Sequence, residues 1–167
     1  MIKNLFIGIL LITAALNFAS CSKDDDPQNS DSEKASFTIN GTKVSEMFYT
    51  LCEVSYSPKE VVFEANFKYD NDTYSLDLAL PSIKSLDEIK AGDKYDADDF
   101  TVYKFYSMSG AFVGSKDYWP TDGTVTIQAV SSKNVVLKFS KFSFVRELGN
   151  KQEEFTVNGT ISYSIYE

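Results

Sequence analysis

The chain has 167 residues, of which 24 are acidic and 16 are basic, so its formal net charge is −8 at pH 7. It contains no histidine, which excludes Ser-His-Asp and Cys-His catalysis and removes the commonest zinc ligand. An acidic chain with no basic block binds nucleic acid poorly, so we expect no nucleic-acid partner.

Residues 1–20 have the pattern of a signal peptide. A single basic residue, Lys3, precedes an apolar run over residues 5–16, and small residues come directly before Cys21. This arrangement resembles the lipobox of bacterial lipoproteins, although Phe18 stands where that family usually has an aliphatic residue. The resemblance implies cleavage before Cys21 and a membrane anchor of acyl chains such as palmitate on its sulfur. The alternative is an ordinary secretory signal followed by a chance cysteine.

Residues 21–35 read "CSKDDDPQNSDSEKA" and have almost no apolar side chain, so we expect a disordered acidic tether. Lys23, Asp24 and Asp25 resemble the export signal of Bacteroidota lipoproteins, which implies delivery to the cell surface on the outer membrane. A second interpretation is that these residues only keep the tether solvated. The remainder, residues 36–167, has the length of a single domain.

Apolar and polar residues alternate with period two along this domain, which is typical of half-buried strands. The clearest case is 61–69, followed by a turn at 70–72 and a second alternating run at 74–80, which together predict an antiparallel hairpin. Strands do not alternate with helices, so we predict an all-β domain: an antiparallel β-sandwich or sandwich-like barrel with one short helix. Further strands are expected near residues 100–106, 123–130, 134–145 and 154–166.

Asn-Gly occurs twice, and strand register gives the two copies different meanings. A turn at Asn40-Gly41 would set apolar residues of its two arms opposite one another, so it predicts a hairpin. A turn at Asn158-Gly159 would set apolar residues against polar ones, so this copy is expected within a long final strand or at a bulge in it. The alternation in "VVLKFSKFSFV" changes phase once, and a β-bulge near Ser140-Lys141 would keep its aromatic residues on one face.

One short helix is expected over residues 86–91. A capping box from Ser85 to Glu88 would begin it, and Gly92 would end it. Such a helix would plug an open end or edge of the sheets. Cys52 has no intramolecular partner if the other cysteine is acylated, and we interpret it as a small apolar core residue rather than a reactive thiol.

Several segments of the domain resemble small β-rich lipoproteins of Bacteroidota whose domain families have no assigned function. The resembling segments are "FTINGTKV", "DGTVTIQAV", "FSKFSFV" and "FTVNGTISYSI". The resemblance implies a β-sandwich or sandwich-like barrel on a lipid tether, and it supplies no catalytic residue.

Carboxylates are the remaining candidates for chemistry, and they lie in two loops. Neither loop has the spacing of an EF-hand, and in an acidic protein such loops are usually just solvated, so we predict no metal and no cofactor. A glycosidase-type pair of carboxylates leaves no local motif in a sequence, but nothing in the chain favours an enzyme. The loop carboxylates are Asp70, Asp72, Asp93, Asp96, Asp98 and Asp99.

The segment 103–120 is the richest in aromatic residues and holds the only tryptophan. A loop that carries Phe112, Tyr118 and Trp119 would present flat faces to a sugar ring or a partner protein, so these three residues are the predicted ligand contacts. The alternative interpretation, which is favoured, is that the aromatic residues pack in the core or cover one end of the sandwich.

The sequence therefore predicts a surface-anchored, non-enzymatic binding or accessory module for a glycan or a partner protein. Two alternatives stay open. One is a lipocalin-like carrier of a small apolar ligand, although the early Gly-x-Trp signal of lipocalins is missing. The other is a structural subunit of a cell-surface assembly, which an unpaired edge strand would favour.

Overall fold

The computed structural model describes residues 36–107 and 118–166, all within one compact unit of the chain, Asp31–Glu167. The predicted signal peptide, the tether with Cys21, Lys23, Asp24 and Asp25, and the predicted contact Phe112 lie outside the described residues. Within the described residues, no helix has the length and apolar character needed to cross a bilayer.

Strands account for 74% of the structure, and no helix reaches seven residues, which confirms the all-β class. Two 3-10 turns, Leu86–Glu88 and Ala97–Asp99, lie between strands. The described strands are β1 (Ser36–Ile39), β2 (Thr42–Lys43), β3 (Glu46–Tyr56), β4 (Lys59–Tyr69), β5 (Asp72–Leu80), β6 (Lys94–Asp96), β7 (Thr101–Ser107), β8 (Tyr118–Val130), β9 (Asn134–Leu148) and β10 (Lys151–Ile165).

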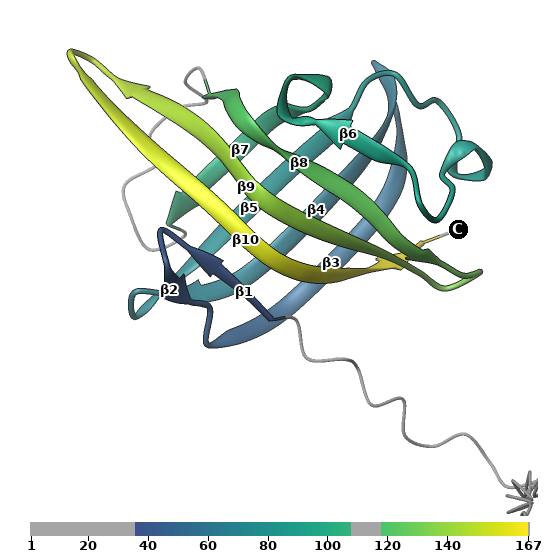
Figure 1. The fold of residues 1–167 in the computed structure, drawn as a ribbon, viewed down its shortest axis with the longest axis horizontal. Helices are drawn as coiled ribbons and strands as arrows, with labels where there is room; N and C mark the ends of the chain where they lie inside the picture. The colour runs from purple at the N-terminus through teal and green to yellow at the C-terminus, as the bar shows by residue number, and fades with distance from the viewer. Residues whose placement is uncertain (1–35, 108–117, 167) are drawn as a thin grey trace, which may run out of the picture. The chain divides into compact units, whose positions relative to one another are not determined.

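The strands form one curled sheet in the order β6-β8-β9-β10-β3-β4-β5-β7, a half-barrel in which β8, β9 and β10 cross in front of β3, β4, β5 and β7 (Figure 1). Neighbouring strands are antiparallel, as predicted, except that β10 and β3 run parallel through Ser164–Leu51 and Ile165–Cys52. β1 pairs with β10 and with β2. β10 therefore has β9 on one side and both β1 and β3 on the other.

Two predicted hairpins are confirmed. Asn40-Gly41 joins β1 to β2, and both residues have the positive φ that this two-residue turn requires. Asp70 and Asn71 join β4 to β5 in the same way, with φ of 48° and 64°. Asparagine and aspartate tolerate this left-handed backbone better than other side chains, so the local sequence determines where both chain reversals occur.

The predicted bulge in β9 is confirmed. Ser140 and Lys141 lie opposite a single residue of β10, Asn158. Lys141 has a φ of 52°, and its N–H donates to Oδ1 of Asn158 at 2.7 Å. The extra residue shifts the phase of the strand, so that Phe139 and Phe142 on its two sides are both buried.

Asn158-Gly159 lies inside β10, as predicted. Gly159 has a φ of 115°, and a Cβ atom there would lie 2.1 Å from the carbonyl oxygen of Ser36 on β1. The close approach of β1 to β10 therefore requires glycine at this position.

The predicted helix over residues 86–91 is wrong in length. The structure has only a 3-10 turn, Leu86–Glu88, in which Oγ of Ser85 accepts from the Asp87 N–H, and the backbone is extended again at Ile89. Ile89 is buried in the core, and an extended backbone takes its side chain there after one turn.

Aromatic rings fill the space enclosed by the curled sheet. Phe105 of β7 lies 4.6 Å from Phe155 of β10 and 5.3 Å from Phe144 of β9, measured between ring centroids. Phe63 of β4 contacts Tyr163 of β10 in an edge-on arrangement. Cys52 is fully buried, and burial raises the pKa of its thiol to about 12, which confirms its role as an apolar core residue.

Candidate functional site

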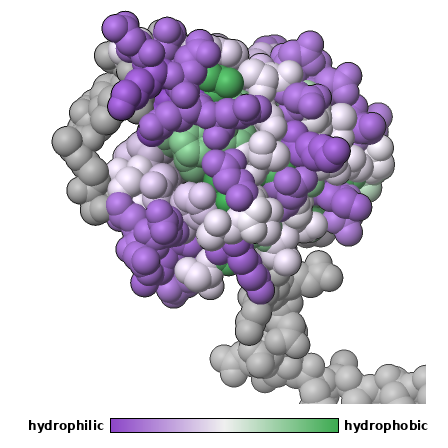
Figure 2. Space-filling model, turned by 60° about the vertical axis from the view of Figure 1, so that its left-hand side comes forward, coloured by the Kyte–Doolittle hydropathy of each residue, from purple (hydrophilic) through white to green (hydrophobic). Residues whose placement is uncertain are grey.

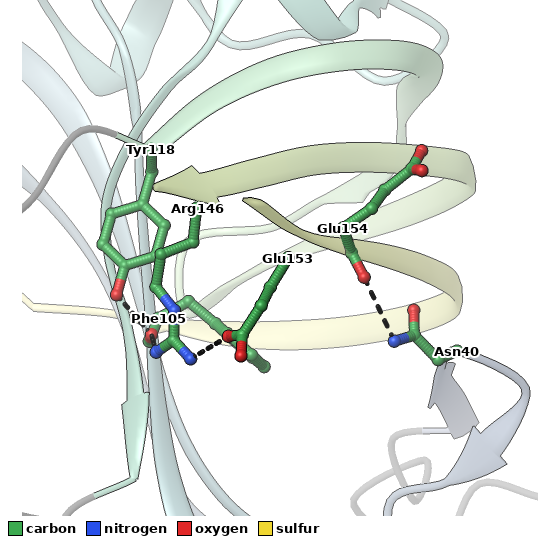
Figure 3. Close-up of polar contacts among 6 residues, drawn as sticks. All are labelled: Asn40, Phe105, Tyr118, Arg146, Glu153 and Glu154. Atoms are coloured by element: carbon green, nitrogen blue, oxygen red, sulfur yellow. Dashed lines mark hydrogen bonds and ion pairs between the residues drawn. The ribbon is translucent and has the colours of Figure 1, made fainter. Parts of the chain in front are cut away.

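The seam between β7 and β8 is closed by side chains rather than by a strand ladder. The carbonyl oxygen of Phe105 on β7 accepts hydrogen bonds from the Tyr118 hydroxyl and, at 3.4 Å, from Nη1 of Arg146 (Figure 3). Arg146 also forms an ion pair with Glu153 and lies over the ring of Phe155, 5.5 Å from its centroid. These contacts give the Phe105 carbonyl oxygen its hydrogen-bond donors, and they hold β7 against β8 and β9.

This end of the molecule is not uniformly polar. Figure 2 shows apolar residues at the surface between groups of hydrophilic ones, on the side that faces left in Figure 1.

The Arg146 guanidinium is largely buried, and its Nε has no hydrogen-bond partner among the described residues. The arrangement suits a structural clamp, because the guanidinium is already committed to Glu153, Phe105 and the Phe155 ring.

The predicted contacts Tyr118 and Trp119 lie on opposite faces of β8. Tyr118 pairs with Arg146, packs against the core and uses its hydroxyl at the seam. Trp119 pairs with Val145, so strand alternation directs its side chain outward, where it is half-buried. The structure thus does not bring the two residues together on one surface, and their role as ligand contacts stays a prediction.

A second surface, which the sequence analysis missed, lies on the outward face of β3, β4, β5 and β7. Strand register aligns Tyr49, Asn66, Ser75 and Tyr106 in one line across the four strands, which we call the tyrosine row. Tyr49 is 47% exposed, whereas Ser75 between the two tyrosines is buried.

An adjacent line of side chains supports the tyrosine row. It consists of Leu51, Glu64, Asp77 and Lys104, and we call it the charged row. Nζ of Lys104 lies 2.7 Å from Oδ2 of Asp77, and this hydrogen bond is the main reason that the pKa of Lys104 is raised.

Hydrogen bonds connect the two rows. The Ser75 hydroxyl donates to Oδ1 of Asp77 at 2.8 Å, and the Asn66 amide donates to Oε1 of Glu64 at 3.4 Å. The pKa of Glu64 is raised, first by burial and then by the charge of Asp77. These bonds therefore hold the polar side chains of this face in fixed orientations.

Another polar contact lies further along the same strands. The Tyr103 hydroxyl on β7 donates to the buried carboxylate of Glu60 on β4. This hydrogen bond is the main cause that raises the pKa of Tyr103 to about 12, followed by burial.

The carboxylates of Asp72 and Asp99 have structural uses. The Asp99 carboxylate accepts from the Asp96 N–H at 2.9 Å and caps the second 3-10 turn. Asp72 accepts from the Thr73 N–H at 2.8 Å and from the Ser107 hydroxyl. Within the described part of the chain, no group of three or more cysteine, aspartate or glutamate side chains is placed to hold a metal ion.

The sequence indicates part of the outward surface. Its alternation shows that Glu64, Asn66 and Lys68 share one face of a strand, but it does not show which strands lie on either side.

No protein-family model matches the chain, and comparison with curated proteins and with solved structures also finds no match.

Proposed function

We propose that this protein is a surface-anchored, non-enzymatic lipoprotein that binds a glycan or a partner protein. The observation that carries the proposal is that large aromatic side chains stand outward although the inward positions are occupied by packed rings. Tyr49, Phe48 and Tyr166 are 47%, 52% and 75% exposed. Exposed aromatic side chains of this kind commonly mark binding surfaces.

The anchor is proposed from the N-terminal sequence. The lipobox resemblance supports acylation of Cys21, and Lys23, Asp24 and Asp25 support placement on the outer membrane facing outward, as in the Bacteroidota lipoproteins that the chain resembles. Membrane attachment through more than one acyl chain would be stable, because each buried methylene contributes about 0.8 kcal/mol.

The two alternative functions have weaker support. A lipocalin-like carrier needs an enclosed space, whereas Phe105, Phe144 and Phe155 are in mutual ring contact where such a ligand would lie. A structural subunit that joins copies through its last strand needs that strand at an edge, whereas β10 is paired with β9 on one side and, at residues 157–160 and 164–165, with β1 and β3 on the other.

Mass spectrometry of the native protein tests the anchor. We expect a diacylglyceryl group on Cys21 and partitioning into the detergent phase, both lost in Cys21→Ala and both kept in Cys52→Ala. A bare thiol at Cys21 together with partitioning into the aqueous phase would contradict the proposal.

A glycan array and a pull-down from outer-membrane extracts test the binding function. Trp119 fluorescence provides a separate readout of the predicted contact. An emission maximum that is already blue-shifted and does not respond to a ligand found on the array would argue against Trp119 as a contact.

A further inference from the structure

The tyrosine row has the dimensions of an extended binding surface. Tyr49 on β3 and Tyr106 on β7 are separated by two intervening strands. Neighbouring strands lie about 4.8 Å apart, so the backbone positions of the two tyrosines are about 14 Å apart across the sheet, a span that accommodates a short chain of sugar rings. Between the tyrosines lie Asn66, which is half-buried, and Ser75, which is buried and donates its hydroxyl to Asp77.

Charge selects among the ligands that this surface could take. The tyrosine row has no formal charge. Two cations lie beside it: Lys104 is paired with Asp77 at 2.7 Å, and Lys68 lies opposite Glu46 of β3 in the strand register. Glu64 adds a negative charge, which repels phosphate, sulfate and uronate groups. Glu64 is itself half-buried and lies in the same row as Lys104, so it attracts a basic partner only weakly. A neutral ligand rich in hydroxyl groups complements the surface best.

We propose that the tyrosine row binds a neutral oligosaccharide that lies across β3, β4, β5 and β7. The exposed Tyr49 ring at one end and the half-buried Tyr106 ring at the other stack against the apolar faces of sugar rings. The Asn66 amide and the Glu64 carboxylate donate to and accept from sugar hydroxyls between them. Because these groups lie on a sheet and are held by bonds to one another, little ordering accompanies binding. The inference rests on the proposed binding function and assigns it a site and a ligand class.

The test begins with the full-length protein on an array of neutral oligosaccharides of glucose, mannose, galactose and xylose, with oligogalacturonate and sulfated oligosaccharides as the anionic arm. We expect binding to a neutral member and none to the anionic arm. The affinity for that neutral oligosaccharide is then measured by calorimetry for a set of variants.

Tyr49→Ala and Tyr106→Ala are each expected to weaken binding by about tenfold, the loss of one aromatic contact. Tyr49→Phe keeps the ring and is expected to keep most of the affinity. Tyr106→Leu removes the flat ring while retaining apolar volume, so it provides a second variant if Tyr106→Ala does not fold. Tyr56→Ala is the matched control, because Tyr56 is 91% exposed near the far end of the same strand as Tyr49.

Each outcome is decisive for the site. Tenfold losses in the two row variants, with unchanged binding by Tyr56→Ala and unchanged melting temperatures, support it. Binding that survives both row variants but is lost in Trp119→Ala would overturn the tyrosine row and leave the proposed function intact. Binding only to the anionic arm overturns the ligand class. No binding to any arm overturns the inference, and capture of a membrane protein in the pull-down would then show that the broader proposal still holds.

Discussion

The two faces of β4 and β5 are held by different forces. On the inward face, Phe63, Phe67 and Leu78 are completely buried among other apolar side chains. On the outward face, Ser75 and Asp77 are almost as inaccessible, yet hydrogen bonds and an ion pair hold them. Inaccessibility alone therefore does not define the core of this sheet. The inward face stabilises the fold, and the outward face fixes the positions of polar groups.

The largest expected effect comes from emptying an inward position. Phe63→Ala is expected to lower the free energy of unfolding by about 3–5 kcal/mol, because a buried ring is replaced by a cavity. Val62→Ala, one residue along on the outward face, is expected to cost about 1 kcal/mol or less. Chemical denaturation measures both. Similar losses for the two variants would remove the distinction between the faces.

The next effect tests the ion pair on the outward face. Lys104→Met leaves the buried Asp77 carboxylate with only the Ser75 hydroxyl, and we expect a loss of about 2 kcal/mol in the free energy of unfolding. The same substitution at Lys138, an exposed lysine on β9, is the control and is expected to change stability by less than about 0.5 kcal/mol. If both variants unfold at the same denaturant concentration, the pair contributes nothing to stability.

The inward face also contains a polar group, the hydroxyl of Tyr163, and its removal tests the cost of burying such a group without a partner. The Tyr163 hydroxyl is buried on the inward face and has no hydrogen-bond partner among the described residues. Tyr163→Phe removes this unsatisfied group and is expected to raise the free energy of unfolding by about 1 kcal/mol. A loss of stability in the same denaturation experiment would mean that the hydroxyl is satisfied in solution.

The smallest effect is a dependence on alkaline pH. Hydrogen bonding to Glu60 raises the pKa of Tyr103 to about 12 from an ordinary value of 10.0, so the folded state favours the protonated hydroxyl. Its contribution to stability is full below pH 10 and is lost as the pH rises towards 12. Thermal melts across this range should show a steeper decline for the wild type than for Tyr103→Phe. Parallel declines would contradict the assigned role of this hydrogen bond.

The buried, inward-facing residues and the turns could be predicted from the sequence, because the patterns that indicate them are local. The alternation at 61–69 identified the buried face of β4, the phase change at Ser140-Lys141 located the bulge, and register distinguished Asn40-Gly41 from Asn158-Gly159. The helix prediction failed because its capping signal at Ser85 extends over only one turn, and the demand to bury Ile89 then decides the conformation.

The contacts on the outward face could not be predicted from the sequence, because they form between strands that are distant along the chain. Asp77 and Lys104 become neighbours only when β5 pairs with β7, and Tyr49 joins the row only when β3 pairs with β4. Nothing local predicts the parallel contact of β10 with β3 either. Tyr118 and Trp119 show the converse limit: adjacency in the sequence suggested one joint surface, and the pleat of β8 separates them.

The position of β10 in the middle of the sheet has a consequence for how the chain is made. Strands β6, β8 and β9 form one part of the sheet, and strands β3, β4, β5 and β7 form the other. Backbone pairing joins the two parts only through β10, which follows all the other strands in the chain. A ribosome releases the earlier strands first, so each nascent part presents open hydrogen-bonding edges until the last one is synthesised. The single sheet can therefore be completed only after β10 has been made and has paired with strands on both sides of it.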